Sequence, residues 1–166
     1  MCEHCGCRGI EPIAELMDEH YHLLDEAHRI RRMMAAGDRE RARQLLDDLV
    51  GHLDVHVRRE EAGIFRALRE RNDYLDEVEA LEREHDAFDA AITALDPGRP
   101  DFERSVSRLL VELDEHVERE NLGIFPVSVV TLGAKGWERV ARARSEHPTF
   151  LHERTQGGDT ITDQPG

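Results

Sequence analysis

Apolar residues recur every three or four positions along four long stretches of the chain, a spacing that predicts amphipathic helices. These stretches cover residues 10–36, 39–71, 75–95 and the chain from 101 onwards. Pro126 should kink or end the last of them, and a shorter helix is expected over 134–145. Because the sequence carries no strand signal, the pattern predicts an all-α fold.

Turn and cap residues separate the predicted helices. Gly37 should end the first helix, and Asp38 should cap the second. Residues 72–73 and 96–98 carry the next two turn signals. Long helices joined by short loops predict an up-down-up-down four-helix bundle with a short C-terminal helix.

At 166 residues the chain is long enough for one domain with a sizeable core. We expect the bundle and its C-terminal helix to occupy residues 10–146. A Cys-rich N-terminal tip over 1–9 should precede it, and a flexible polar tail over 147–166 should follow.

Charge and hydropathy exclude several kinds of partner. The formal net charge of −14 argues against nucleic acid and against anionic membrane surfaces. No apolar run approaches the roughly 18 residues of a spanning helix, and the N-terminal residues lack the apolar core of a signal peptide. We therefore expect a cytoplasmic protein that binds neither nucleic acid nor membrane.

One segment of the chain occurs twice, as HLDVHVRREEAGIF over 52–65 and as ELDEHVERENLGIF over 112–125. Each copy contains His-x-x-x-Glu, and the repeated pairs are His56 with Glu60 and His116 with Glu120. Residues four apart share one helix face, so each copy directs an imidazole and a carboxylate the same way. Two such pairs facing one another would form a transition-metal site.

Polar residues also interrupt the apolar stripes of the other two long helices. Glu19-His20 precedes the first copy by about one helix, and Glu84-His85 precedes the second in the same way. A lone histidine in a core is usually only hydrogen-bonded, but buried carboxylates at matched positions require compensation. A bound cation supplies it, and imidazole with carboxylate suits iron, zinc or manganese.

The order His, His-x-x-x-Glu, His, His-x-x-x-Glu resembles the hemerythrin-like (HHE cation-binding) family over residues 10–146. The flanking Glu-Glu-x-Gly-Ile-Phe and Gly-Ile-Phe-Pro are similar to that family too. The resemblance implies a bundle that holds two iron ions, Fe²⁺ or Fe³⁺, which an oxo or hydroxo group can bridge. It implies His20, His56, His85 and His116 as terminal ligands, with Glu60 and Glu120 bridging the irons.

The chain departs from the pattern of the oxygen-carrying hemerythrins at two places. Their third helix carries His-x-x-x-His, whereas here Leu81 and Asp89 lie four residues to either side of His85. Their fourth helix has an Asp where this chain has Asn121, and Glu120 takes that role one residue earlier. The resulting ligand set argues against reversible oxygen carriage. It is more similar to that of di-iron proteins linked to iron–sulfur cluster repair and nitric oxide chemistry.

Several further residues are candidates for supporting roles. His52 and Glu112 lie one turn before the two pairs, and each is expected to orient a ligand or to be an extra ligand. Asp89, Glu61 and Tyr21 are weaker candidates.

Other notable residues lie off the predicted ligand line. His22, at the margin of the first helix, should have a surface role. Gly63 and Gly123 occupy matched mid-helix positions, and should allow close helix approach or leave room for a small ligand.

The N-terminus gathers four soft or borderline ligands: Cys2, His4, Cys5 and Cys7. They suit a tetrahedral zinc ion, but equally a reversible disulfide or a group that accepts iron or electrons. A further alternative is that these residues form an exposed tail without a single role, because the Cys-x-x-Cys motif of many zinc sites is not repeated here.

The resemblance implies a protein that binds or senses dioxygen, peroxide or nitric oxide at an open iron position. The alternatives are a di-iron enzyme that decomposes peroxide or reduces nitric oxide, and an iron storage or delivery protein linked to iron–sulfur cluster repair. No nucleophile or general base stands apart from the proposed ligands, so the sequence leaves catalysis undecided. It indicates no protein partner.

Overall fold

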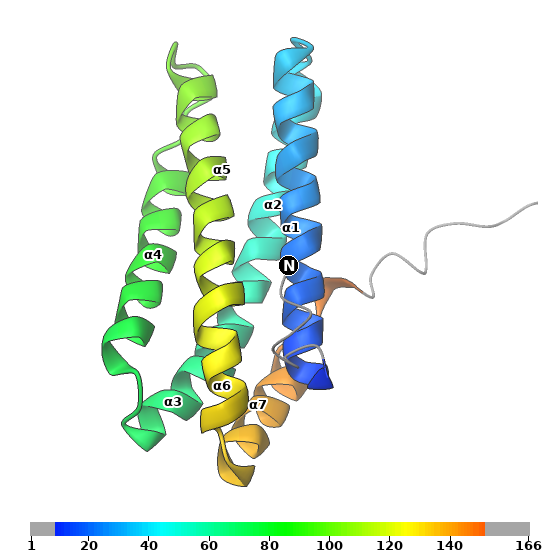
Figure 1. Ribbon diagram of the computed structural model, residues 1–166. Coiled ribbons are helices and arrows are strands. Elements are labelled where there is room, and N and C mark those ends of the chain that lie inside the picture. The colour runs from blue at the N-terminus through cyan, green and yellow to red at the C-terminus, as the bar shows by residue number, and fades with distance from the viewer. Residues whose placement is uncertain (1–8, 152–166) are drawn as a thin grey trace, which may run out of the picture.

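The computed structural model describes residues 9–151, and its regular structure within that range is entirely helical (Figure 1). The helices are α1 (Glu11–Ala35), α2 (Arg39–Glu60), α3 (Arg66–Arg71), α4 (Leu75–Thr93), α5 (Phe102–Arg119), α6 (Phe125–Thr131) and α7 (Ala134–Glu146). Two π-helical segments, η2 (Glu61–Phe65) and η3 (Glu120–Ile124), join α2 to α3 and α5 to α6. The all-α prediction is confirmed.

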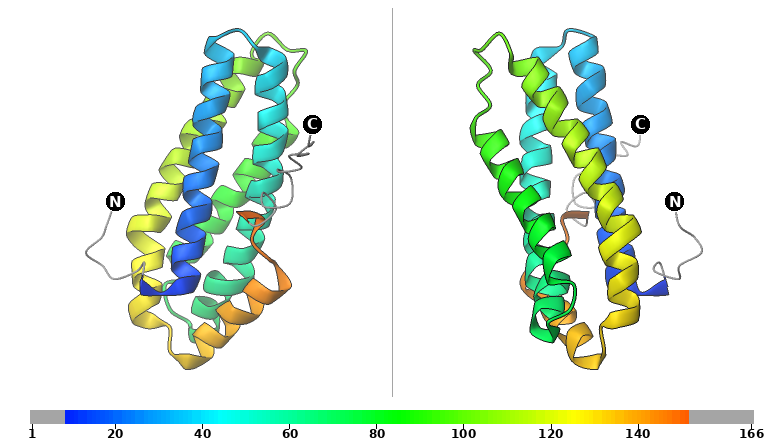
Figure 2. Two further views of the ribbon diagram at one scale, coloured as in Figure 1. Left: turned by 90° about the vertical axis from the view of Figure 1, so that its right-hand side faces the viewer. Right: turned by 60° about the vertical axis from the view of Figure 1, so that its left-hand side comes forward.

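The long helices pack side by side, with α1 against α2 and α4 against α5 (Figures 1 and 2). Further contacts join α1 to α5 and α3 to α4. Helix α7 crosses one end of the molecule and packs on η2 and α3. This arrangement is consistent with a hemerythrin-like helical bundle.

Local sequence accounts for the ends of these helices. Gly37 has a φ of 76°, a left-handed conformation that glycine adopts without steric cost. The Asp38 side chain accepts a hydrogen bond of 3.1 Å from the Arg41 backbone N–H, as predicted for an N-cap. Asn72 closes α3 in the left-handed region, with φ of 59°.

The fourth predicted helix does not end at Pro126, because a π turn comes directly before it. The backbone N–H of Phe125 bonds to the carbonyl of Glu120, five residues earlier. Pro126 has no N–H to donate, and lies in the first turn of α6, where that loss costs little. Helix α6 then continues to Thr131.

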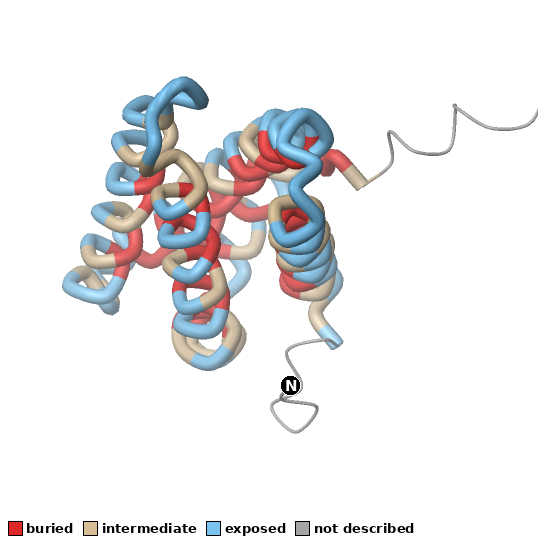
Figure 3. Tube along the Cα trace, turned by 90° about the horizontal axis from the view of Figure 1, so that it is seen from above, coloured by how far each residue is buried: buried red, intermediate tan, exposed pale blue. Residues whose placement is uncertain are grey.

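A buried polar layer divides the core into two apolar clusters, and buried positions line the inward faces of the helices (Figure 3). The cluster nearer α7 includes Ile13, Leu16, Ile64, Phe65, Leu68, Ile124 and Phe125. The other cluster includes Leu23, Ile30, Leu49, Phe88, Leu110 and Leu113. On each long helix the polar layer falls where one cluster gives way to the other.

The matched glycines have different surroundings. A Cβ on Gly63 would lie 3.4 Å from the Cβ of Ala143, so this glycine does allow close approach of α7. A Cβ on Gly123 would meet nothing within 4 Å. The prediction of close approach therefore holds for Gly63 alone.

The packed chain extends beyond residue 146, where the flexible tail was expected to begin. Thr149 and Phe150 are buried, and Phe150 joins the apolar cluster that includes Leu49. In Figure 2 this segment runs back beside α2. The remainder of the predicted tail, 152–166, and residues 1–8 of the Cys-rich tip lie outside the described residues.

Candidate metal centre

Each of the four long helical segments of the bundle contributes an imidazole to the polar layer, and two of these segments also contribute a carboxylate. The contributing residues are His20 on α1, His56 and Glu60 on α2, His85 on α4, His116 on α5 and Glu120 in η3. All six are buried, and the most exposed of them, His85, is only 4 % exposed. The structure therefore brings together the six residues singled out in the sequence.

One half of the cluster gathers around His20 and His56. The Nε2 atom of His20 lies 3.1 Å from Oε2 of Glu120 and 3.7 Å from Oε1 of Glu60. The Nε2 atom of His56 lies 3.2 Å from the same Glu60 oxygen. Two nitrogens and two carboxylate oxygens thus converge within 4.8 Å of one another.

The other half uses the remaining oxygens of the same two carboxylates. The Nε2 atom of His85 lies 3.6 Å from Oε2 of Glu60 and 3.9 Å from Oε1 of Glu120. The Nε2 atom of His116 lies 3.3 Å from that Glu120 oxygen. Each carboxylate therefore presents one oxygen to each half, which is the arrangement of a bridging ligand.

Two glutamates orient imidazoles on the neighbouring helix. Glu19 on α1 accepts a 2.7 Å hydrogen bond from Nδ1 of His56 on α2. Glu84 on α4 accepts a 2.6 Å hydrogen bond from Nδ1 of His116 on α5. Each glutamate of the repeated Glu-His dipeptide thus supports the histidine of the next helix, not its own neighbour in sequence.

The other two imidazoles are oriented by the residues that directly follow Glu60 and Glu120. Glu61 accepts a 2.8 Å hydrogen bond from Nδ1 of His85, and the Asn121 amide oxygen accepts one of 3.0 Å from Nδ1 of His20. Because Nδ1 of each ring makes one of these hydrogen bonds, each Nε2 is directed toward the carboxylates, where it can bind a cation once it carries no proton.

The Gly-Ile-Phe repeat supplies an aromatic wall to each half. Phe125 stacks on the His20 ring with centroids 5.3 Å apart, and Phe65 stacks on His85 at 5.7 Å. Both phenylalanines are fully buried. They keep water from the outer faces of these rings and fix their planes.

Without a metal, the pKa shifts in the cluster favour protons on His116 and His56 over a proton on Glu120. Burial lowers the pKa of His116, but the adjacent Glu120 carboxylate outweighs burial and raises that pKa to about 9. The pKa of His56 is raised in the same way, as Glu60 and then Glu120 outweigh burial. Burial would raise the pKa of Glu120, yet His116 and His20 hold it well below its usual range.

The cluster fits a bound cation because six of its buried polar atoms lack hydrogen-bond partners. These atoms are Nε2 of His20 and of His56, and both carboxylate oxygens of Glu60 and of Glu120. Burying such groups unpaired costs about 1–3 kcal/mol each, and more when they are charged. Nitrogen and oxygen donors in this combination satisfy iron, manganese or zinc.

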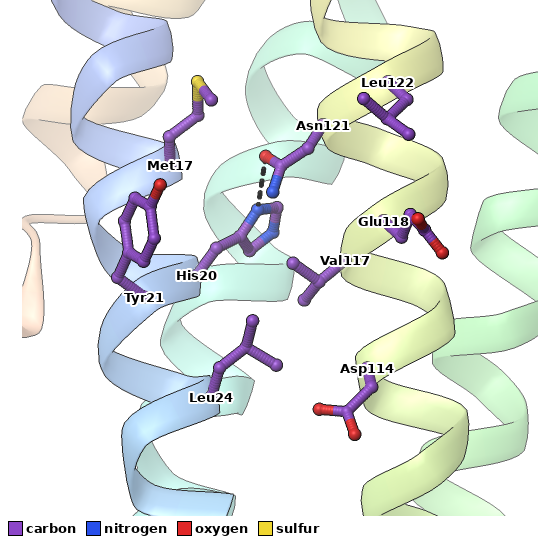
Figure 4. Close-up of a pocket in the computed structure, with 9 residues that line it drawn as sticks. All are labelled: Met17, His20, Tyr21, Leu24, Asp114, Val117, Glu118, Asn121 and Leu122. Carbon is purple, nitrogen blue, oxygen red and sulfur yellow. Dashed lines mark hydrogen bonds between the residues drawn. The ribbon is translucent and has the colours of Figure 1, made fainter. Parts of the chain in front are cut away.

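A cavity of about 300 Å³ lies next to the cluster, between α1 and the continuous helical segment formed by α5 and η3 (Figure 4). His20 and Asn121 form the part of its wall that faces the cluster. Much of the remaining wall is apolar, from Met17, Leu24, Val117 and Leu122. The cavity gives a small molecule an approach to the His20 half.

The remaining sequence candidates are placed differently from expectation. His52 bonds to Glu26, and not to any of the six cluster residues. Glu112 is half-buried and belongs to neither group of converging ligand atoms, and Asp89 is exposed. Tyr21 lines the cavity.

The supporting residues that sequence reasoning missed are Glu19, Glu84 and Asn121. The repeated Glu-His dipeptide was the available signal for the two glutamates. The N-terminal candidates Cys2, His4, Cys5 and Cys7 lie outside the described residues.

Comparison with known proteins identifies one match. The family described as hemerythrin HHE cation binding domain matches residues 11–150. No curated protein and no solved structure gives a significant match. In the part of the chain that the structure describes, no helix combines the length and apolar character needed to cross a membrane.

Removing the support of one imidazole should weaken metal binding without removing a ligand. We expect Glu84→Gln to lower metal affinity by about 10- to 100-fold, because His116 loses a charged acceptor at Nδ1. Competition with a coloured chelator measures the affinity. Glu112→Gln on α5 is the matched control and should bind as the unaltered chain does; equal losses in both variants would contradict the assignment.

The metal-free protein should become less stable as the pH rises from 6.5 through about 9. The pKa of His116 is raised above its ordinary 6.5, so the stability it contributes is complete below 6.5 and is lost through about 9. Thermal melts in a chelator measure this slope, and His116→Gln should flatten it. An unaltered chain with no slope in that window would refute the assigned protonation.

Proposed function

The chain belongs to the hemerythrin HHE cation-binding family, and from this premise we propose that its core binds two iron ions, one in each half of the cluster. The observation that carries the proposal is the sharing of both carboxylates: Glu60 and Glu120 each give one oxygen to either half. A site for one ion would use a single group of ligand atoms. Here two groups are built from matched halves of the chain.

Bound iron would supply a redox-active centre with open coordination positions for a small oxidant. The chain's own residues hold and isolate that centre. The Nδ1 acceptors keep the four imidazoles in one tautomer and orientation, and the two carboxylates fix the separation of the halves. The apolar clusters on either side exclude bulk water.

We propose that the physiological ligand is dioxygen, peroxide or nitric oxide, and that the protein binds or senses it. The cavity beside His20 supports this proposal, because its volume of about 300 Å³ and its mostly apolar wall suit a small, weakly polar molecule. His20 and Asn121 stand between the cavity and the cluster. A ligand entering there would meet the His20 half first.

Metal content tests the two-iron proposal directly. The purified chain should hold two irons, and His56→Ala or His116→Ala should each lower the content because a nitrogen donor is lost. His147→Ala is the control, since His147 follows α7 and belongs to neither group of ligand atoms. Elemental analysis and the near-ultraviolet spectrum measure the iron content per chain. The same iron content in all three variants as in the unaltered chain would contradict the ligand assignment.

Blocking the cavity tests the approach of the oxidant. Leu24→Trp should slow the reaction of the reduced, iron-loaded protein with nitric oxide or peroxide several-fold, while its iron content stays unchanged. Val111→Trp, at an exposed position on α5 outside the cavity wall, should have no effect. Stopped-flow absorbance gives the rates. Equal rates in both variants would reject this route, and sustained turnover would favour the enzyme alternative over binding.

A further inference from the structure

A third group of converging ligand atoms lies between α1 and α2, apart from the two groups of the main cluster. It consists of His22 and Glu26 on α1 and His52 on α2. Oε1 of Glu26 lies 3.3 Å from Nε2 of His22 and 2.9 Å from Nδ1 of His52. All three ligand atoms fall within 4.8 Å of one another, so a single ion could contact each of them.

The internal repeat does not account for this group. The positions that match His22 and Glu26 in the second half of the chain are Ala87 and Ala91. The position that matches His52 is Glu112, which joins no such group. The three residues are therefore a property of the first half alone and serve no symmetric role in the main cluster.

The buried carboxylate of Glu26 favours a cation here. The Glu26 side chain is 3 % exposed, whereas those of His22 and His52 are 16 % and 26 % exposed. A buried carboxylate requires positive charge beside it, and it repels anions. The imidazoles at the rim remain accessible to ions from solution, through a cavity of about 330 Å³ that Arg29, Arg41 and Asp48 also line.

We propose that His22, Glu26 and His52 bind a divalent ion of the zinc type, separate from the iron centre. Two imidazoles and one carboxylate are a known donor set for zinc, with a remaining position for water. Asp48 lies one turn before His52 on α2 and lines the same cavity, where its carboxylate offsets part of the positive charge of Arg29 and Arg41.

The ion would also hold the C-terminal segment in place. The Phe150 ring stacks on His52 with centroids 4.5 Å apart and tilts against His22 at 5.4 Å. Fixing the two imidazoles on one ion fixes the surface on which Phe150 packs. Ion binding should therefore slow amide exchange at Phe150 and Leu151.

Cobalt is the probe, because Co²⁺ replaces zinc in such sites and absorbs in the visible range. The full chain is first loaded with iron, freed of excess metal and titrated with Co²⁺. We expect one further equivalent to bind per chain, and His22→Ala and Glu26→Gln to lose it. His28→Ala, an exposed histidine on the same helix, should keep it. Glu26→Gln retains an acceptor for His52, so its loss of cobalt would not reflect a lost hydrogen bond.

The number of Co²⁺ equivalents bound by His28→Ala, minus the number bound by His22→Ala, gives the ions held at this site. Ions bound in the main cluster cancel in this difference, so the test is independent of the proposed iron centre. If Glu26→Gln does not fold, the partly exposed His22→Ala carries the comparison. Slower exchange at Phe150 on adding Co²⁺, absent in His22→Ala, would support the site. Equal cobalt binding in His22→Ala and His28→Ala, or no further equivalent in the unaltered chain, would show a hydrogen-bonded triad only.

Discussion

The structure depends on the meeting of two fully buried carboxylates, Glu60 and Glu120, at the centre of the helical bundle. Two like charges removed from water are unfavourable unless opposite charge compensates them. Four imidazoles surround the pair, and in the metal-free chain protons on His116 and His56 supply part of that compensation. A cation would replace those protons with a fixed positive charge, so the arrangement that is unfavourable without a cation is the one that suits a metal.

The hydrogen bonds that orient the imidazoles also tie the helices together. Glu19 and Glu84 each link two helices within one half of the chain, whereas Glu61 and Asn121 each reach across to the other half. Metal binding and bundle packing therefore use one network. The network is not fully symmetric, since a neutral amide supports His20 where a carboxylate supports His85. The neutral side is the one that faces the cavity.

Local structure at the ends of the repeat serves the same network. The π segments begin at Glu120 and directly after Glu60, and contain the residues that support His85 and His20. π turns within α-helices are frequent at functional sites. They also place Phe65 and Phe125 over the imidazoles, which explains why the Gly-Ile-Phe sequence recurs with each His-x-x-x-Glu pair.

The sequence by itself determined the helices and the six converging residues. Apolar spacing and His-x-x-x-Glu are patterns within a single helix, so they can be recognised without knowing the contacts between helices. It could not determine what each side chain meets on another helix, since that depends on the rotation and axial offset of packed helices. Glu19 therefore supports His56, not its neighbour His20, and His52 meets Glu26, not the main cluster. Tertiary packing alone decided these contacts, and with them the separate group of His22, Glu26 and His52.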